Sequence, residues 1–172
     1  MLSGKKIYLR SLEPSDADII LKWENNPNNW SVSNTLVPFS RKLIEDYVSS
    51  AQDIYSVKQV RFIICLVENG REIGAIDLFD FDPFHARVGL GVLIAELEDR
   101  RHGYAKEAVS LIKEYCFNQL NLHQVYCNVL SENKASVDLF EKSGFIICGT
   151  KKGWNKGTDG WLDELMFQCF NR

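Results

Sequence analysis

The chain has 172 residues, of which 45% are hydrophobic and 25% are charged, and its formal net charge is -3 at pH 7. This length and composition are typical of one soluble globular domain that buries its core without disulfides or structural metal. The acidic charge argues against a protein that chiefly binds nucleic acid or an anionic membrane.

The first part of the chain is predicted to contain one strand and two helices. Residues 6–12, KIYLRSL, alternate apolar and polar side chains as a strand does. Pro14, Ser15 and Asp18 form a helix-start signature before residues 17–25, and the polar segment 25–40 that follows is expected to be a loop. Ser40 then caps a second helix, whose apolar face is formed by Leu43, Ile44, Tyr47, Val48 and Ala51.

The middle of the chain is predicted to be a hairpin followed by a further strand. Residues 60–68 and 71–81 flank Asn69-Gly70, a strong hairpin signal because both residues tolerate a positive φ. Residues 86–95, ARVGLGVLIA, read as the next strand. A helix follows, because apolar residues recur at helical spacing at Ala105, Ala108, Val109, Ile112, Tyr115 and Cys116.

The last part is predicted to contain three strands and one short helix. Residues 124–130, QVYCNVL, return to the period of a strand, and residues 132–144 form a helix that Gly144 ends. Residues 145–150 and 161–170 form two strands around NKGTDG. This order predicts a single α+β domain over residues 1–172, with a mixed sheet, helices on its faces and one parallel strand–helix–strand unit.

The cysteines and histidines predict neither a disulfide nor a metal site. The sequence contains no Cys-x-x-Cys, and His85, His102 and His123 lie far apart. No apolar run near the N-terminus is long enough for a signal peptide. We therefore expect a cytoplasmic protein with reduced, mostly buried thiols at its five cysteines, Cys65, Cys116, Cys127, Cys148 and Cys169.

The main candidate for a binding site is the turn Arg100-Arg101-His102-Gly103 before the helix that starts near Tyr104. A helix start has unpaired N–H groups and a partial positive charge, so a basic turn with a glycine suits a pyrophosphate, and Lys106 adds a cation. The sequence has no P-loop motif, and Gly89-Leu90-Gly91 does not complete a dinucleotide-binding fingerprint. On spacing alone the alternative stays open that the arginines are solvated and Gly103 only turns the chain.

Residues 100–105, RRHGYA, resemble the Arg/Gln-x-x-Gly-x-Gly/Ala motif of the GNAT superfamily of N-acetyltransferases, with Arg100 first, Gly103 as the glycine and Ala105 last. Four further segments agree in order: IYLRSLEPSDAD with WENNP, REIGAIDL, NLHQVYCNVLSENKASVDLFEKSGF, and DGWLDELMF. The set is similar to the branch that contains ribosomal-protein alanine acetyltransferases of the RimJ/RimL type and spermidine acetyltransferases.

The resemblance implies a GNAT fold, with a mostly antiparallel twisted sheet of about seven strands and helices on both faces. It implies an enzyme that uses acetyl-CoA, with no metal, to acetylate a primary amine by direct attack on the thioester. The acceptor is a protein N-terminus, a polyamine or a small amine. A homodimer is expected by analogy only.

The resemblance also assigns cofactor-binding residues. The backbone of Val92, Leu93 and Ile94 would pair with the pantetheine arm, and the thioester would lie where the two parallel strands separate. Asn133 and Ser136 would line the far side of the cofactor, although Asn133 is equally a helix cap, and both roles can coexist. Arg100 begins the motif. The pyrophosphate would be held by the backbone N–H groups of the five residues that follow it, Arg101, His102, Gly103, Tyr104 and Ala105.

Many relatives have a tyrosine as general acid where this chain has Phe140. Ser136 lies one helical turn earlier on the same face and resembles the proposed acid of the ribosomal-protein branch, so we expect it, or a water, to protonate the thiolate. An α-amine, with a pKa near 8, costs about 1 kcal/mol to deprotonate at pH 7, against about 4–5 kcal/mol for a polyamine amine. The missing tyrosine therefore favours an α-amine slightly.

Carboxylates near the resembling segments are the candidates for proton transfer and for binding a cationic acceptor. Asp77 or Glu24 could take the proton through one water, and Asp80 could bind the substrate, although each is also explained as an exposed structural acid. Trp23 is expected to shape the acceptor pocket, with Trp30, or else to belong to the core. Two further readings remain: a non-catalytic acyl-CoA-binding module, and an antibiotic acetyltransferase whose acidic pocket uses Asp77, Asp80 and Asp82.

Overall fold

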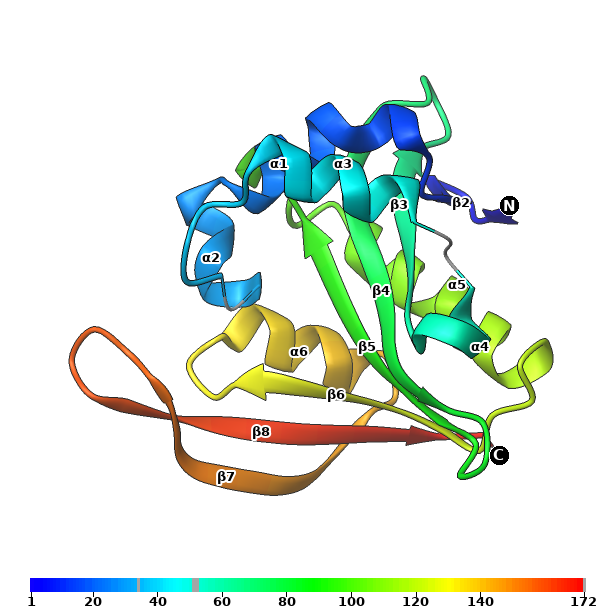
Figure 1. Ribbon diagram of the computed structural model, residues 1–172. Helices are drawn as coiled ribbons and strands as arrows, with labels where there is room; N and C mark the ends of the chain where they lie inside the picture. Colours follow the sequence, from blue (N-terminus) through cyan, green and yellow to red (C-terminus); the bar gives the residue numbers. More distant parts are fainter. Residues whose placement is uncertain (34, 51–52, 172) are drawn as a thin grey trace.

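The computed structural model describes residues 1–33, 35–50 and 53–171, and it contains one eight-stranded sheet in the order β1-β2-β3-β4-β5-β6-β8-β7 (Figure 1). The α+β fold and the mixed sheet are as expected, with a two-residue strand, β1, added at the edge. The strands are β1 (Leu2–Ser3), β2 (Ile7–Ser11), β3 (Val60–Leu66), β4 (Glu72–Asp82), β5 (Arg87–Ile94), β6 (Gln124–Leu130), β7 (Ile146–Lys156) and β8 (Trp161–Phe170).

The only parallel neighbours in this described sheet are β5 and β6, joined through helix α5 (Tyr104–Asn118). Their pairing covers only Arg87–Gly89 against Gln124–Tyr126. Beyond it the two strands diverge (Figure 1). The predicted strand–helix–strand unit is therefore confirmed, and the second half of β5 pairs with β4 but is open on the side facing β6.

Helices cover both faces of the sheet because the buried strands alternate their side chains between two cores. On β3, Ile63 and Cys65 pack with α1 (Ala17–Glu24) and α3 (Arg41–Ser49), whereas Ile64 and Leu66 belong to the core that contains α5. Helix α6 (Lys134–Lys142) adds Phe140 to this second core. Helices α1 and α3 therefore cover one face of the sheet, and α5 and α6 cover the other.

The segment expected to be a loop contains a helix, α2 (Pro27–Ser33). The interpretation was wrong because it read Pro27 as a breaker, whereas proline fits the first helical position, where its missing N–H is not needed. Asn26 supports this start, since its Oδ1 accepts a hydrogen bond from the amide of Asn28 at 3.0 Å. A short helix α4 (Ile54–Val57) was also not expected. Ala51, predicted on the apolar face of α3, lies outside the described residues.

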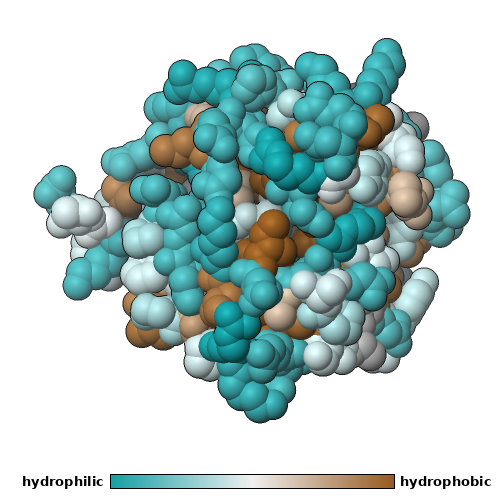
Figure 2. All heavy atoms as spheres, turned by 90° about the horizontal axis from the view of Figure 1, so that it is seen from above, coloured by the Kyte–Doolittle hydropathy of each residue, from teal (hydrophilic) through white to brown (hydrophobic). Residues whose placement is uncertain are grey.

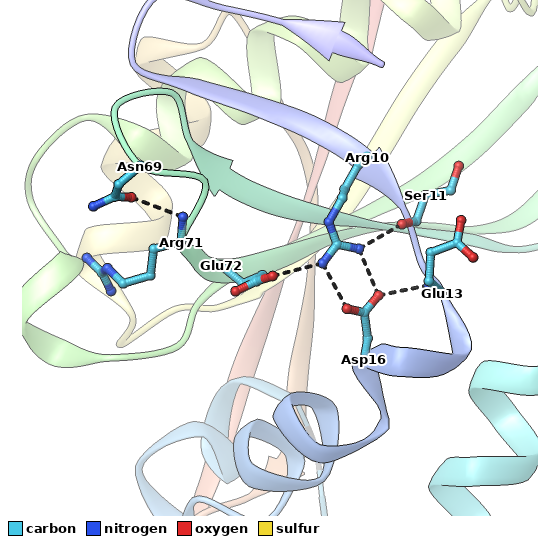
Figure 3. A network of polar contacts seen from close by, with 7 residues as sticks. All are labelled: Arg10, Ser11, Glu13, Asp16, Asn69, Arg71 and Glu72. Atoms are coloured by element: carbon cyan, nitrogen blue, oxygen red, sulfur yellow. Dashed lines mark hydrogen bonds and ion pairs between the residues drawn. The ribbon is translucent and has the colours of Figure 1, made fainter.

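The β3–β4 hairpin forms at Asn69-Gly70 as predicted, with Gly70 at φ 75°. Beside it lies the Arg10 cluster, made of Arg10, Asp16 and Glu72 (Figure 3). Arg10 bonds both carboxylate oxygens of Asp16 at 2.8 Å and Glu72 at 3.1 Å. The cluster joins β2, β4 and the 3-10 turn Pro14–Asp16.

The five cysteines are free, and only Cys148 is exposed. Within the described residues, no helix combines the length and apolar character that a membrane span requires.

Candidate active site

A cavity of about 700 Å³, here called the cleft, lies between the diverging halves of β5 and β6. One wall comes from α1, α3, β3 and β4, and the other from β6 and the first turns of α6. Figure 2 shows the molecule from above the view of Figure 1: the surface is largely hydrophilic, with apolar atoms visible between the polar side chains near its centre. The cleft contains candidates from both halves of the chain.

The turn before α5 has the main-chain geometry of an anion site. Arg101 (φ 67°) and Gly103 (φ 85°) are both in the left-handed region, and Gly103 is the N-cap residue of α5. This N-cap makes no side-chain capping hydrogen bond. The first N–H groups of α5 are therefore available to a ligand, and together with the partial positive charge of the helix start they fit a pyrophosphate.

A cation from the other end of the chain lies beside this turn. Nζ of Lys6 donates to the carbonyl oxygen of His102 at 3.0 Å, and a Cβ at Gly103 would lie 4.0 Å from the same Nζ. His102 also stacks on Tyr104, with ring centroids 5.5 Å apart. Sequence reasoning missed Lys6 because 96 residues separate it from the motif and no local pattern connects them.

Arg100 is partly buried and directs its guanidinium at protein groups. Nε donates to the carbonyl of Ile94, and Nη2 to Oδ1 of Asn29, both at 3.0 Å. Its amide donates to Leu97, in the 3-10 turn Leu97–Asp99, so the contribution of Arg100 to a phosphate site would be to hold the turn against β5 and α2. The alternative that Arg100 is simply solvated is therefore wrong, because its guanidinium bonds protein groups.

The same turn is anchored to the hairpin by Arg71 and Asp99. The two guanidinium nitrogens of Arg71 lie 2.6 and 2.8 Å from the oxygens of Asp99, whose side chain is buried. The hydrogen bonds and charge of Arg71 outweigh burial and lower the pKa of Asp99 below its ordinary value. The Arg71–Asp99 pair therefore helps to hold the main-chain groups at the start of α5 in place.

The cofactor candidates on the strand and on α6 also reach the cleft. Val92 and Leu93 line it, while Ile94 is buried behind them. Asn133 lines the opposite wall and caps α6 at the same time, because its Oδ1 accepts from the amide of Ser136 at 3.1 Å. The two roles weighed for Asn133 are therefore compatible. Ser136 lines the cleft beside it.

Phe140, at the position of the tyrosine of many relatives, is 4% exposed and packs against Phe145 and Phe167 while its edge lines the cleft. It cannot donate a proton. Trp23 is 3% exposed and forms both core and cleft wall, so its two readings coincide. Trp30 instead fixes the end of α1, because its Nε1 donates to the carbonyl of Glu24 at 2.9 Å.

Glu24 and Asp77 are brought together by a residue that sequence reasoning missed, Arg61. Its Nε and Nη2 bond the two oxygens of Asp77 at 2.6 and 2.9 Å, and its Nη1 bonds Glu24 at 2.7 Å. The guanidinium lies over the ring of Tyr47, 5.5 Å from its centroid. These four residues, here called the Arg61 cluster, all line the cleft.

Asp80 does not join them. It is exposed, at φ 50°, and its carboxylate lies 3.4 Å from the hydroxyl of Tyr126. Asp80 lines a second hollow of about 600 Å³ together with Asp82 and Arg87, which form an ion pair. The two hollows share Asn128 in their walls.

The model of the acetyltransferase (GNAT) domain matches residues 6–146 of the chain. The chain belongs to the GNAT family of acetyltransferases. It is similar to the uncharacterized N-acetyltransferase p20 of Bacillus licheniformis (27% identity, covering 99% of this chain and 96% of that protein) and to the spermidine N(1)-acetyltransferase of Vibrio cholerae (29% identity, covering 83% and 80%).

Solved structures share the fold of this GNAT domain. The crystal structure of spermidine N-acetyltransferase from Vibrio cholerae in complex with CoA and spermine has a TM-score of 0.87 at 24% identity, covering 97% of this chain and 96% of that chain. A GNAT-family acetyltransferase from Bacillus anthracis has a TM-score of 0.82 at 18% identity, covering 98% and 97%. Together, motif, fold and family identify the protein as an acetyl-CoA-dependent N-acetyltransferase that acts on a primary amine.

Acetyl-CoA, when bound, supplies the acetyl group and a thiolate leaving group. The GNAT domain itself provides main-chain donors at the α5 start, an open strand edge on β5 and a hydroxyl at Ser136. No group of three or more histidine, cysteine or acidic side chains in the described residues could hold a metal ion. The match to the acetyltransferase domain favours a catalytic protein over the non-catalytic reading.

Proposed function

We propose that the enzyme acetylates a flexible polycationic amine of the polyamine class. The observation that carries this proposal is the excess of negative charge on the cleft wall formed by α1, β3 and β4, where Glu24 and Asp77 share only Arg61. A third carboxylate of the cleft wall, Glu164, has its own partner in Lys151 at 2.8 Å. The unbalanced charge is a feature that a cationic acceptor would complement.

The relatives support the same acceptor class. Curated relatives include spermidine N(1)-acetyltransferases of Vibrio cholerae and Escherichia coli, and the solved structure with CoA and spermine has the same fold. An antibiotic acceptor is supported less well, because Asp80 and Asp82 line a hollow separate from that of Asp77. Asp80 remains a candidate for binding a distal part of a long acceptor.

We infer that Ser136 protonates the departing thiolate. It lines the cleft on the wall opposite the Arg61 cluster, and Phe140 leaves no phenol for this step. For a thiol with a pKa near 8.5, the free-energy difference between releasing a thiolate and releasing a thiol at pH 7 is about 2 kcal/mol. On the acceptor side, a polyamine amine costs about 4–5 kcal/mol to deprotonate, so one of the two expected carboxylates must take the proton through a water. We propose Asp77 for this step, while Glu24 binds the acceptor.

A protein N-terminus is the second candidate acceptor. Phe140 favours it, because an α-amine costs less free energy to deprotonate at pH 7 than a polyamine amine does.

Thiol release from acetyl-CoA separates the candidates in a panel of spermine, spermidine, a diamine, a monoamine, an alanine-terminated peptide and an aminoglycoside. We expect kcat/KM to be highest for the polyamines. Higher kcat/KM for the peptide would replace the proposed acceptor, and binding of acetyl-CoA without thiol release from any amine would contradict turnover itself. The free cysteines suit a reducing compartment such as the cytoplasm.

A further inference from the structure

The Arg61 cluster is an ionic group built into the wall of the cleft. Its charged side chains are mostly buried: 17% of the Arg61 side chain, 14% of Glu24 and 32% of Asp77 are exposed. Arg61 comes from β3, Asp77 from the neighbouring β4, and Glu24 from the end of α1. Buried charges are tolerated when they are paired and hydrogen-bonded, so the arrangement of this cluster is fixed by its own contacts.

The charges within the Arg61 cluster do not cancel. Two carboxylates face one guanidinium, which gives one uncompensated negative charge. Tyr47 contributes its ring face to Arg61, and burial, the largest influence, raises the pKa of its hydroxyl, so Tyr47 stays neutral at physiological pH. A single cation of the acceptor would balance the cluster.

We propose that Arg61 is a positioning and specificity residue, which orients Glu24 and Asp77 and cancels one of their charges so that the cluster binds one ammonium of the acceptor. This rests on the proposed function, since it requires a cationic acceptor. The nitrogen bound here stays protonated because of the charge that it balances, so a second nitrogen must be the one acetylated. The substrate class is therefore an amine with at least two basic nitrogens.

Charge-cycle variants test the proposal. The wild-type cluster carries -1, Glu24→Gln carries 0, Arg61→Gln carries -2, and the double variant returns to -1. We expect Glu24→Gln to raise KM for spermidine about tenfold or more while kcat changes little, because one charge-assisted hydrogen bond is lost from binding. The double variant should recover a KM within about twofold of wild type. A purely structural arginine would instead make the double variant at least as poor as Glu24→Gln.

Glu24→Gln also separates binding from proton transfer. If Glu24 is a base, kcat falls and the acidic limb of the kcat–pH profile moves while KM is unchanged, and that outcome overturns the proposal. Glu24→Gln keeps the size of the side chain, so the test stands even where Arg61→Gln does not fold. Unfolding temperature and CoA affinity, measured by calorimetry, check that each variant is intact.

The matched control is Glu72→Gln. Glu72 is the second carboxylate of Arg10, as Glu24 is the second carboxylate of Arg61, but it does not line the cleft. We expect Glu72→Gln to leave KM for spermidine unchanged. Absence of polyamine turnover by the wild-type enzyme would refute the proposed acceptor alone. The same cycle would then be measured with the most active amine of the panel, and equal KM values in wild type and Glu24→Gln would refute the role of Arg61.

Discussion

Arg10 and Arg61 each hydrogen-bond two carboxylates, and they lie in different regions of the molecule. Arg10 bonds both oxygens of Asp16 and one of Glu72 beside the β3–β4 hairpin (Figure 3), whereas Arg61 bonds both oxygens of Asp77 and one of Glu24 in the cleft. The side-chain chemistry is the same. The Arg10 cluster joins β2, β4 and the 3-10 turn outside the cleft, and the Arg61 cluster lines the cleft between the diverging strands.

The difference teaches that position relative to the cleft, and not the ionic motif, decides what such a cluster can do. Hydrogen bonds and charge from Asp16 raise the pKa of Arg10. At Arg61 burial acts to lower the pKa, but the carboxylate partners outweigh it and raise the pKa as well, so both arginines stay charged. Glu72 is open to solvent, with 36% of its side chain exposed, whereas Glu24 and Asp77 hold their surplus charge in the wall of a cavity that can enclose an acceptor. Matched substitutions in the two regions should therefore separate stability from binding.

The largest expected effect is on stability, from Arg10→Met. It leaves the carboxylate of Asp16, whose side chain is 6% exposed, without its cation, and breaking a buried pair in this way costs about 3–5 kcal/mol. Denaturant unfolding at pH 7 measures the loss. KM for spermidine in the folded fraction should stay at the wild-type value. A destabilisation no larger than that of an exposed pair such as Arg41–Asp18 would show that the Arg10 cluster is not structural.

The pH dependence of this loss gives a second check. Burial alone would raise the pKa of Asp16, but the hydrogen bonds from Arg10 and from the amide of Glu13, with the charge of Arg10, hold the pKa below its ordinary value. A lowered folded-state pKa contributes stability above the unfolded pKa of about 3.9, and this stability is lost as the pH falls through the folded value. The difference between wild type and Arg10→Met should therefore shrink below pH 4. A constant difference would contradict the ion pair as its cause.

A second matched pair uses the main chain. Gly103 (φ 85°) opens α5, and Gly70 (φ 75°) turns the hairpin, so valine is strained at both positions. We expect Gly103→Val to weaken CoA binding about 100-fold, because a displaced turn loses one or two charge-assisted hydrogen bonds. Gly70→Val should lower the unfolding temperature and leave CoA affinity unchanged.

Calorimetric titration with CoA measures both glycine variants, and Arg101→Ala is the side-chain control. If main-chain donors hold the phosphates, Arg101→Ala has a much smaller effect than Gly103→Val. Equal, small effects of these two substitutions would refute the main-chain site at the α5 start.

The same contrast explains how much the sequence could predict. Apart from the short β1 and the second half of β7, the strands, the hairpin at Asn69-Gly70 and the turn before α5 follow from local patterns, because each depends on residues close together in the chain. The Arg61 cluster gathers residues 24, 47, 61 and 77 from four elements, and no spacing rule connects them. Lys6 beside His102 is a similar case, since it depends on β2 lying against the start of α5.

Where the local sequence pattern predicted a wrong or incomplete structure, contacts with other segments of the chain determine the structure observed. Pro27 was expected in a loop but begins α2, which places Asn29 where Arg100 reaches it. Arg100 was assigned to the cofactor by its motif position, but its guanidinium bonds Ile94, six residues earlier, and Asn29, 71 residues away, and the motif encodes neither contact. Ser136, by contrast, was assigned by the family resemblance together with its helical spacing from Phe140, and it does line the cleft.

The smallest expected effect comes from a comparison of substitutions at two serines, one at each end of α6. Ser136, in the first turn of α6, lines the cleft, and Ser143, just after its last turn, donates from its hydroxyl to the carbonyl of Leu139 at 2.7 Å. If Ser136 protonates the thiolate, Ser136→Ala should lower kcat about 10- to 30-fold, since about 2 kcal/mol is at stake. CoA affinity should not change. Ser143→Ala should lower stability by about 1 kcal/mol and leave kcat unchanged. An unchanged kcat in Ser136→Ala would return the proton to a water, because no other hydroxyl on this face of α6 replaces the tyrosine that Phe140 lacks.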